Sequence, residues 1–188
     1  MTLKRAAAIT GIAEMRPSRS PAGKSTLGIM VDVAREAILD AGLSREEIDG
    51  VLIGPPITEM VPMWPAHVGE YLGIHPRYED VVDLGGASAA GMAWRAAAAI
   101  QAGLCNAVVC VTGEASDVET FYAPRARRPT QQLPIREFEA PYGPMGVNSG
   151  YALIAQRHMH EYGTTSRQLA KIAADQRANA CANPDALF

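Results

Sequence analysis

The sequence predicts an α/β protein with a mostly parallel sheet. Apolar runs at 6–13, 51–53, 78–84 and 107–112 are bounded by turn residues, as buried strands are. Segments with helical periodicity lie between them. Strands that alternate with helices pair in parallel, because each helix returns the chain to the same end of the sheet. The 188 residues are enough for one or two small domains.

The amino-acid composition excludes several classes of function. The net charge of -3 and the pI near 5.8 exclude the strongly basic surface typical of proteins that bind nucleic acid or acidic membranes. No apolar run reaches the roughly 20 residues needed to cross a bilayer. The three cysteines form neither a CxxC pair nor a metal-ligand cluster, so we expect reduced thiols in a cytoplasmic protein.

The first predicted strand, at 6–13, is followed by a polar loop and a helix. Ser25 or Thr26 can cap the start of this helix, and Gly42 can end it. Its apolar residues have the three- and four-residue spacing of one buried helix face. They are Leu27, Met30, Val31, Ala34, Ile38 and Ala41.

Short elements come next. Ser44 and Glu47 have the spacing of a capping box and predict a helical turn before the strand at 51–53. A short helix is expected at 64–72. The strand that follows, at 78–84, leads directly into two glycines.

The alanine-rich segment 88–102 predicts a helix that is enclosed on most sides. Arg95 and Gln101 are the only strongly polar residues in its interior, and its small side chains would let sheets approach from two directions. Gly103 can end the helix. The last predicted strand, at 107–112, completes the alternation.

The strand-to-helix corner at Gly85 and Gly86 is the most informative local feature. Glycine allows close backbone approach, and the first amides of a helix have no acceptor within the helix, so they can stabilise a developing anion. A tight structural turn accounts for the local features equally well. Candidate catalytic residues are Gly85, Gly86 and Ser88.

Three stretches resemble the thiolase superfamily, especially its sterol-carrier-protein-type thiolase-like or lipid-transfer branch. Segment 88–116 is similar to the thiolase nucleophile helix, the next strand and a Gly-x-Glu turn. Segment 138–146 resembles the pocket-lining part of the thiolase loop domain. The segments at 162–169 and 178–184 resemble its helical continuation.

The resemblance implies the N-terminal half of a thiolase-like layered fold. Residues 1–120 would form the α/β half, and residues 121–188 an irregular and helical loop domain. A second α/β half, which in thiolases brings catalytic histidine and cysteine motifs, is expected to lie outside these residues. None of the four histidines stands in such a motif, and no metal site is predicted.

A thiolase carries its reactive cysteine at the start of the buried helix, where this sequence has none. Two alignments are possible, one placing Gly86 and the other Ser88 in that position. Ser88 is either a weak nucleophile that needs an adjacent base or the N-cap of the helix. The cysteines Cys105, Cys110 and Cys181 are interpreted as packing residues.

Loss of the thiol leaves three functions open. The resemblance favours an aldolase that cleaves β-hydroxyacyl-CoA by retro-aldol chemistry in lipid or steroid side-chain breakdown. The alternatives are a non-catalytic acyl-CoA- or lipid-binding scaffold subunit and a conventional acetyl-CoA acyltransferase. In each case coenzyme A thioesters are the ligands, and no covalently bound cofactor is expected.

The resemblance also implies binding residues and partners. Arginines can hold two phosphate oxygens at once, although a solvated loop explains them as well. The candidates for binding coenzyme A phosphates are Arg125, Arg127 and Arg128. The candidates for lining the acyl pocket are Tyr142, Met145 and Gly146. We expect a homodimer, a separate C-terminal half and an OB-fold partner protein.

Overall fold

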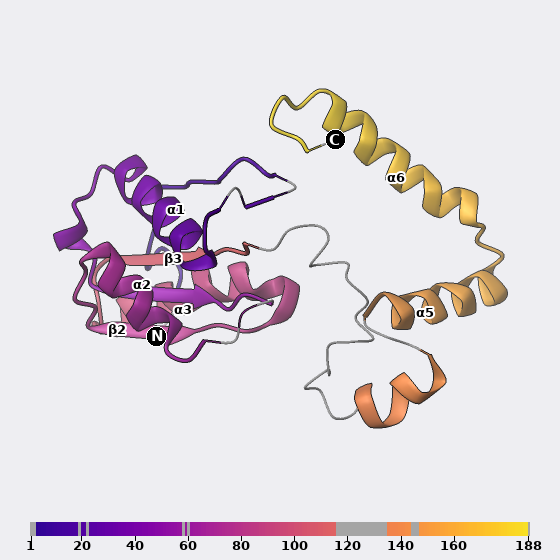
Figure 1. The fold of residues 1–188 in the computed structure, drawn as a ribbon, viewed down its shortest axis with the longest axis horizontal. Helices are drawn as coiled ribbons and strands as arrows, with labels where there is room; N and C mark the ends of the chain where they lie inside the picture. The colour runs from indigo at the N-terminus through magenta and orange to yellow at the C-terminus, as the bar shows by residue number, and fades with distance from the viewer. Residues whose placement is uncertain are drawn as a thin grey trace. The chain divides into compact units, whose positions relative to one another are not determined.

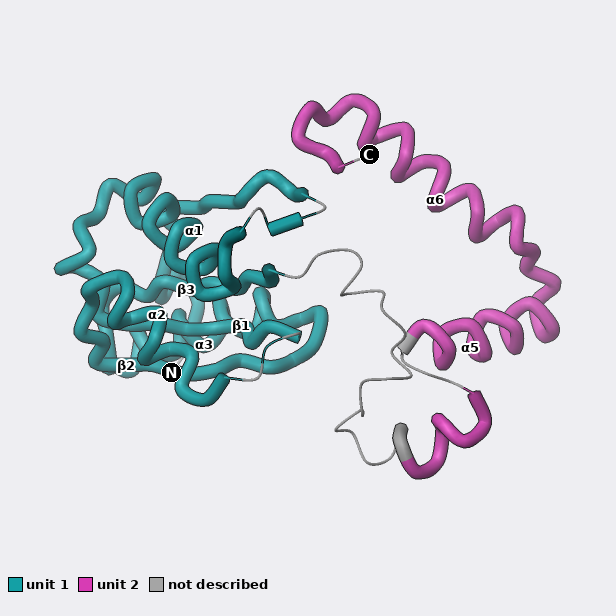
Figure 2. Tube along the Cα trace, in the orientation of Figure 1, with its two compact units in different colours: residues 1–117 teal, residues 118–188 magenta. Residues whose placement is uncertain are grey.

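The structure is a computed structural model, and it describes residues 3–18, 20–21, 23–57, 59, 61–115, 135–143 and 147–187. The chain divides into two compact units, residues 1–117 and 118–188 (Figure 2). Their assignment as a thiolase-like half and a loop domain stays a prediction.

Unit 1 contains a three-stranded parallel sheet with the order β2-β1-β3. The strands are β1 (Gly50–Gly54), β2 (Tyr78–Val81) and β3 (Val108–Thr112). In the register, Leu52 of β1 lies between Asp80 of β2 and Cys110 of β3. The predicted α/β class with a parallel sheet is confirmed.

The helices of unit 1 begin and end close to the predicted residues. The Ser25 hydroxyl accepts the Gly28 N–H at 3.1 Å and caps the first helix. In the predicted capping box, the Ser44 N–H donates to the Glu47 carboxylate at 2.8 Å. The helices are α1 (Thr26–Asp40), α2 (Trp64–Leu72) and α3 (Ser88–Gln101), with single turns η1 (Arg45–Glu47) and η2 (Gly85–Ala87).

Helices cover the sheet on two faces, giving three layers (Figure 1). Alternation along β1 sends Val51 and Ile53 to the face covered by α1 and α2, where the main core lies. Leu52 points to the other face and packs with Val82 and with Met92 of α3. The main core therefore lies on one side of the sheet, and a small cluster lies on the other.

The predicted strand at 6–13 is wrong. Residues 7–18 have no regular secondary structure, and the side chains of Ile9 and Ile12 are exposed. The backbone is held by the end of α1 instead of by a strand, because the Ile12 N–H donates to Asp40 Oδ2 at 2.9 Å. Gly11 lies so close to α1 that a Cβ there would meet the Ala37 carbonyl oxygen at 2.2 Å.

The expected enclosure of α3 is also wrong for the described residues. Only Met92 and Ala99 of this helix are buried, and Trp94 is 64% exposed. Among the described residues one sheet packs against α3, and no second sheet is present to cover its outer face. The helix therefore presents an apolar face to solvent.

The described residues of unit 2 lie mostly in helical segments. None of the α6 side chains is buried. None of the helices in the described part of the chain is long and apolar enough to cross a membrane. The elements are η4 (Ile135–Glu139), η5 (Ala140–Tyr142), α5 (Val147–Tyr162) and α6 (Ser166–Cys181).

Candidate functional site

The candidate site lies at the carboxyl end of the sheet. Parallel α/β sheets bind ligands at this end, because the loops that follow adjacent strands meet there. Here the loops follow β1 at Gly54, β2 at Val81 and β3 at Thr112. The last backbone bond between β1 and the end of β2 runs from the Val82 N–H to the Ile53 carbonyl at 2.8 Å.

The glycine corner after β2 is held in shape by two side chains. The Ser88 hydroxyl donates to the Gly85 carbonyl at 2.7 Å and accepts the Leu84 N–H at 3.0 Å. The Gly85 N–H donates to Asp83 Oδ1 at 3.2 Å. Gly85 has a φ of +56°, a conformation that other residues adopt at a cost. The sequence therefore places a fixed turn directly before α3.

The corner is open to solvent. A Cβ built on Gly85 or Gly86 would have no other heavy atom within 4 Å. The Gly85 N–H is directed to the Asp83 carboxylate, whereas the described residues offer no acceptor to the Gly86 N–H. Within the described contacts, the Gly86 N–H is therefore the donor of this corner that stays available to a negatively charged oxygen.

The Ser88 side chain stabilises the glycine corner by hydrogen bonds to the backbone. Ser88 is the first residue of α3, and the N-cap is Ala87, so the N-cap interpretation is wrong by one position. Its hydroxyl is bonded to backbone groups on both sides, and within the described part of the chain no histidine or carboxylate donates to it or accepts from it. The arrangement does not resemble a nucleophile with its base.

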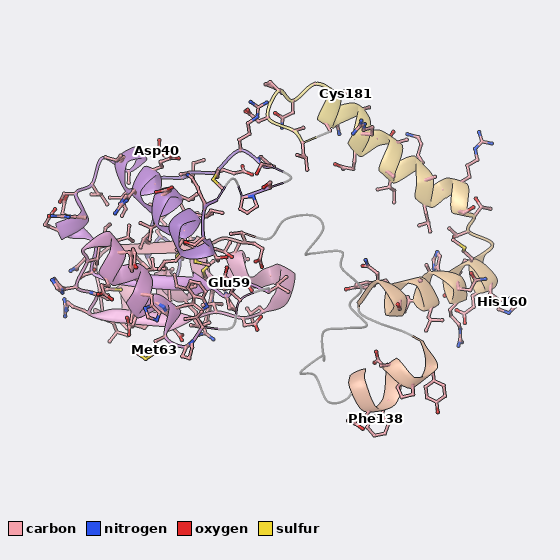
Figure 3. All side chains as sticks on the ribbon, in the orientation of Figure 1. Asp40, Glu59, Met63, Phe138, His160 and Cys181 are labelled. Carbon is pink, nitrogen blue, oxygen red and sulfur yellow. The ribbon has the colours of Figure 1, made fainter. Side chains whose placement is uncertain are left out.

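The sequence analysis missed a second set of contacts at this end of the sheet. The Glu114 carboxylate, which follows β3, accepts the Ile57 N–H of the loop after β1 at 2.7 Å. The fully buried Thr26 hydroxyl donates to Glu59 Oε1 at 2.5 Å and accepts the Ala115 N–H at 3.2 Å. Figure 3 labels Glu59 at this end of unit 1. The sequence analysis named Glu114 in a Gly-x-Glu turn and Thr26 as a possible helix cap, but it predicted none of these contacts.

Close packing holds the turn after β3 against α1. A Cβ on Gly113 would lie 3.1 Å from Ile29 Cγ2 and from Met30 Cγ. The Thr112 hydroxyl donates to the Gly54 carbonyl at 3.1 Å, which joins the ends of β3 and β1. The ends of these strands and the start of α1 thus form one firmly packed base for the loops above them.

No cysteine stands at the corner. The buried Cys105 lies at the opposite end of the sheet, where its Sγ would be 3.4 Å from a Cβ on Gly50. Burial, and then the negative charge of Asp49, raise the pKa of the Cys105 thiol above its usual range. This thiol is therefore kept neutral, which suits the predicted packing role. Among the described residues, no His, Cys, Asp and Glu side chains gather as a metal site.

The structure brings together the three predicted residues Gly85, Gly86 and Ser88. Tyr142 belongs to the other unit, where its side chain is 85% exposed. The remaining predicted binding residues lie outside the described part of the chain. They are Arg125, Arg127, Arg128, Met145 and Gly146.

Comparison with known proteins finds relatives among curated sequences, while no family model matches. The chain is 32% identical over 192 residues to a steroid side-chain-cleaving aldolase of Thermomonospora curvata, covering 99% of this chain and 48% of that protein. It is 28% identical over 188 residues to the 17-hydroxy-3-oxo-4-pregnene-20-carboxyl-CoA lyase of Mycobacterium tuberculosis, covering 97% and 47%. An acetyl-CoA acetyltransferase of Methanothermobacter thermautotrophicus is 30% identical over 157 residues, covering 81% and 39%.

A solved structure is similar as well. A chain of the Ltp2-ChsH2(DUF35) aldolase superposes with a TM-score of 0.79 at 29% identity, covering 96% of this chain and 45% of that one. The chain spans about half the length of the curated relatives it matches. These similarities confirm the thiolase-like α/β fold class and the likeness to thiolase-like proteins of lipid metabolism.

Proposed function

We propose that this chain forms the thioester-binding part of an aldolase that cleaves β-hydroxyacyl-CoA in lipid or steroid side-chain breakdown. The observation that carries the proposal is the open glycine corner, which has no cysteine and whose Gly86 amide has no acceptor among the described residues. Similarity to two steroid-related enzymes, an aldolase and a lyase, over nearly the whole chain supports the same reaction class. The proposal includes membership of the sterol-carrier-protein-type branch.

The reaction suits a site that has amide donors and lacks a thiol. A base removes the proton of the β-hydroxyl group, the Cα–Cβ bond breaks, and a ketone or aldehyde leaves. The electron pair of the broken bond passes into the thioester and forms an enolate, which then takes a proton at Cα. The Gly86 N–H stabilises the enolate oxygen. Acyl transfer by a thiolase instead requires a thiolate, which this corner does not supply.

Other roles follow from the same proposal. Gly85 and Ser88 hold the corner in position. The arginines at 125, 127 and 128 bind the phosphates of coenzyme A, because planar guanidinium groups match phosphate oxygens. The residues Tyr142, Met145 and Gly146 line the acyl group. The base and the proton donor belong to polypeptide beyond these residues.

Partner polypeptides are part of the proposal. The similar solved structure is named as an aldolase of two components, Ltp2 and ChsH2(DUF35). The exposed apolar face of α3, with Trp94 at its centre, also needs a cover. We propose a homodimer, a second α/β half and an OB-fold partner protein.

A scaffold subunit is the second candidate function. It is favoured by the Gly85 N–H, which is already bonded to Asp83, and by the lack of a base beside Ser88 in the described part of the chain. A scaffold would bind acyl-CoA tightly without converting it.

The test is incubation of the purified protein, alone and with its partner polypeptides, with a β-hydroxyacyl-CoA. Release of ketone or aldehyde that does not depend on added coenzyme A supports the aldolase. Release that requires added coenzyme A supports thiolysis and contradicts the proposal. Tight binding without product in any combination supports the scaffold.

A further inference from the structure

We propose that the loop after β1 binds the apolar acyl group of the thioester, and that Glu114 and Thr26 are the residues that position it. This loop, here termed the acyl loop, comprises residues 55–57, 59 and 61–63. The inference deepens the proposed function and rests on it, because it assigns the acyl end of the same ligand to a surface beside the glycine corner.

The acyl loop presents apolar side chains to solvent at the ligand-binding end of the sheet. Ile57 is 78% exposed, Met63 is 71% exposed and Val61 is 40% exposed. Met63 has a φ of +60°, which costs free energy in a residue other than glycine. Several exposed apolar side chains in one loop at such a place are typical of a surface that binds an apolar ligand.

The backbone of the loop is fixed although its side chains face outward. The Glu114 carboxylate holds the Ile57 N–H at 2.7 Å, and the buried Thr26 hydroxyl holds the Glu59 carboxylate at 2.5 Å. Pro55 and Pro56 restrict the first turn further, and Pro56 is buried. A surface whose shape is already set loses little conformational entropy when an apolar ligand binds.

Position links the loop to the glycine corner. The acyl loop leaves β1, and the corner leaves the neighbouring strand β2, at the same end of the sheet. Met92, one turn into α3, reaches the end of β1, where its Cε would lie 3.5 Å from a Cβ on Gly54. A thioester whose carbonyl oxygen meets the Gly86 amide can therefore extend its acyl group along the acyl loop.

The charge of the side chains near the acyl loop favours one end of the coenzyme A thioester over the other. Among the described residues, the carboxylates that hold the loops at this end of the sheet are Asp83, Glu59 and Glu114. Three negative charges repel the phosphates of coenzyme A. The apolar acyl end has no charge to repel, so it is the part of the thioester that this surface suits.

The experiment is calorimetric titration of the full chain with palmitoyl-CoA, acetyl-CoA and free coenzyme A. Ile57→Asp should weaken palmitoyl-CoA binding about tenfold or more, because it puts a charge on the apolar surface, while free coenzyme A binding changes less than about twofold. Ile12→Asp is the matched control. It alters an equally exposed isoleucine at the other end of α1 and should bind all three ligands like the native chain.

Two variants of Glu114 test the positioning role. Glu114→Ala removes the acceptor for the Ile57 N–H and should weaken palmitoyl-CoA binding selectively, whereas Glu114→Gln keeps an acceptor oxygen and should restore it. Thermal unfolding of each variant checks that the fold is intact.

The outcomes separate this inference from the proposed function. Three results would contradict the proposed role of the acyl loop. They are an equal loss of affinity for all three ligands, an unchanged preference for palmitoyl-CoA in Ile57→Asp, and a change of oligomeric state in that variant. If the binding preference follows the expectation while no hydroxyacyl-CoA is cleaved, the proposed function fails and the acyl-binding surface stands.

Discussion

The two ends of the same sheet use carboxylates in different ways. At the amino end, the Asp49 side chain accepts the N–H groups of Asn106 and Ala107 at 2.7 and 3.0 Å and the Asn106 amide at 3.0 Å. Its backbone carbonyl accepts the Arg77 N–H at 2.8 Å. Asp49 precedes β1, and the segments that it binds lead into β2 and β3. One residue therefore joins the entries of all three strands.

At the carboxyl end, carboxylates hold loops whose other groups stay available. Asp83 binds the Gly85 N–H, while the described residues offer no acceptor to the Gly86 N–H, and Glu114 binds the Ile57 N–H while the Ile57 side chain is exposed. Hydrogen bonds to a carboxylate therefore join the strands at one end, and at the other end they hold the two loops that we propose bind the ligand. Stability and binding are thus expected to respond to different substitutions.

The largest expected effect is a loss of stability in the Asp49→Ala variant. The change leaves the Asn106 and Ala107 amides without their acceptor and should lower the free energy of unfolding by about 3 kcal/mol, measured by urea denaturation. Asp83→Ala is the control at the other end. It removes one exposed bond and should cost less than about 1 kcal/mol. Equal losses would contradict the comparison between the two ends.

The next effect concerns the buried hydroxyl beneath the acyl loop. Thr26→Val keeps the shape of the side chain but leaves the Glu59 carboxylate and the Ala115 N–H without a partner. We expect a loss of about 2 kcal/mol in urea denaturation, because unpaired polar groups at a buried position are costly. Thr26→Ser keeps the hydroxyl and should lose about half as much. A Thr26→Ser variant as unstable as Thr26→Val would assign the effect to packing.

A smaller effect is expected in the rate of the proposed reaction. Ser88→Ala removes both bonds that hold the glycine corner and should lower kcat about tenfold, with little change in the free energy of unfolding. A residue that attacked the substrate would lose roughly a thousandfold or more. Steady-state kinetics of the assembled enzyme distinguish the two roles, and a loss of that larger size would identify Ser88 as a nucleophile.

The alternation of apolar runs and helical periodicity was enough to predict the sheet and its helices. It failed at 6–13, because an apolar run shows that a segment is extended but cannot show whether a neighbouring strand is present to pair with it. The alanine content of α3 predicted close packing on both sides, yet in the described part of the chain a single sheet contacts the helix. Local sequence does not reveal which element covers a face.

The candidate site also has one part that the sequence predicted and one part that it did not. The glycine corner was predictable, because its glycines and the start of the helix lie within four consecutive residues. The contacts of Thr26, Glu59 and Glu114 were not, because they join residues that lie 33, 57 and 89 positions apart. Asp49 was missed for the same reason, since its partners are 57 and 58 positions away. Such contacts depend on the fold and leave no local pattern.

The smallest expected effect is the pH dependence of stability that Asp49 gives to the amino end of the sheet. Burial raises the pKa of Asp49, but hydrogen bonds from the Ala107 and Asn106 N–H groups and the Asn106 side chain, with the charge of Arg77, outweigh it and hold the pKa below its usual value. A carboxylate with a lowered pKa in the folded state stabilises the fold above the unfolded pKa of about 4. This stabilisation is lost as the pH falls through the folded pKa.

The free energy of unfolding should therefore fall more steeply below pH 4 in the native chain than in Asp49→Asn, which cannot titrate. Asn106→Ala should flatten the acid dependence more than Arg77→Met, because the Asn106 amide lies 3.0 Å from the carboxylate and the Arg77 guanidinium lies 3.7 Å away on an exposed side chain. Urea denaturation between pH 2.5 and 6 measures all four proteins. Parallel curves for the native chain and Asp49→Asn would show that the amino end is held by packing alone, and the contrast with the carboxyl end would then lose its electrostatic basis.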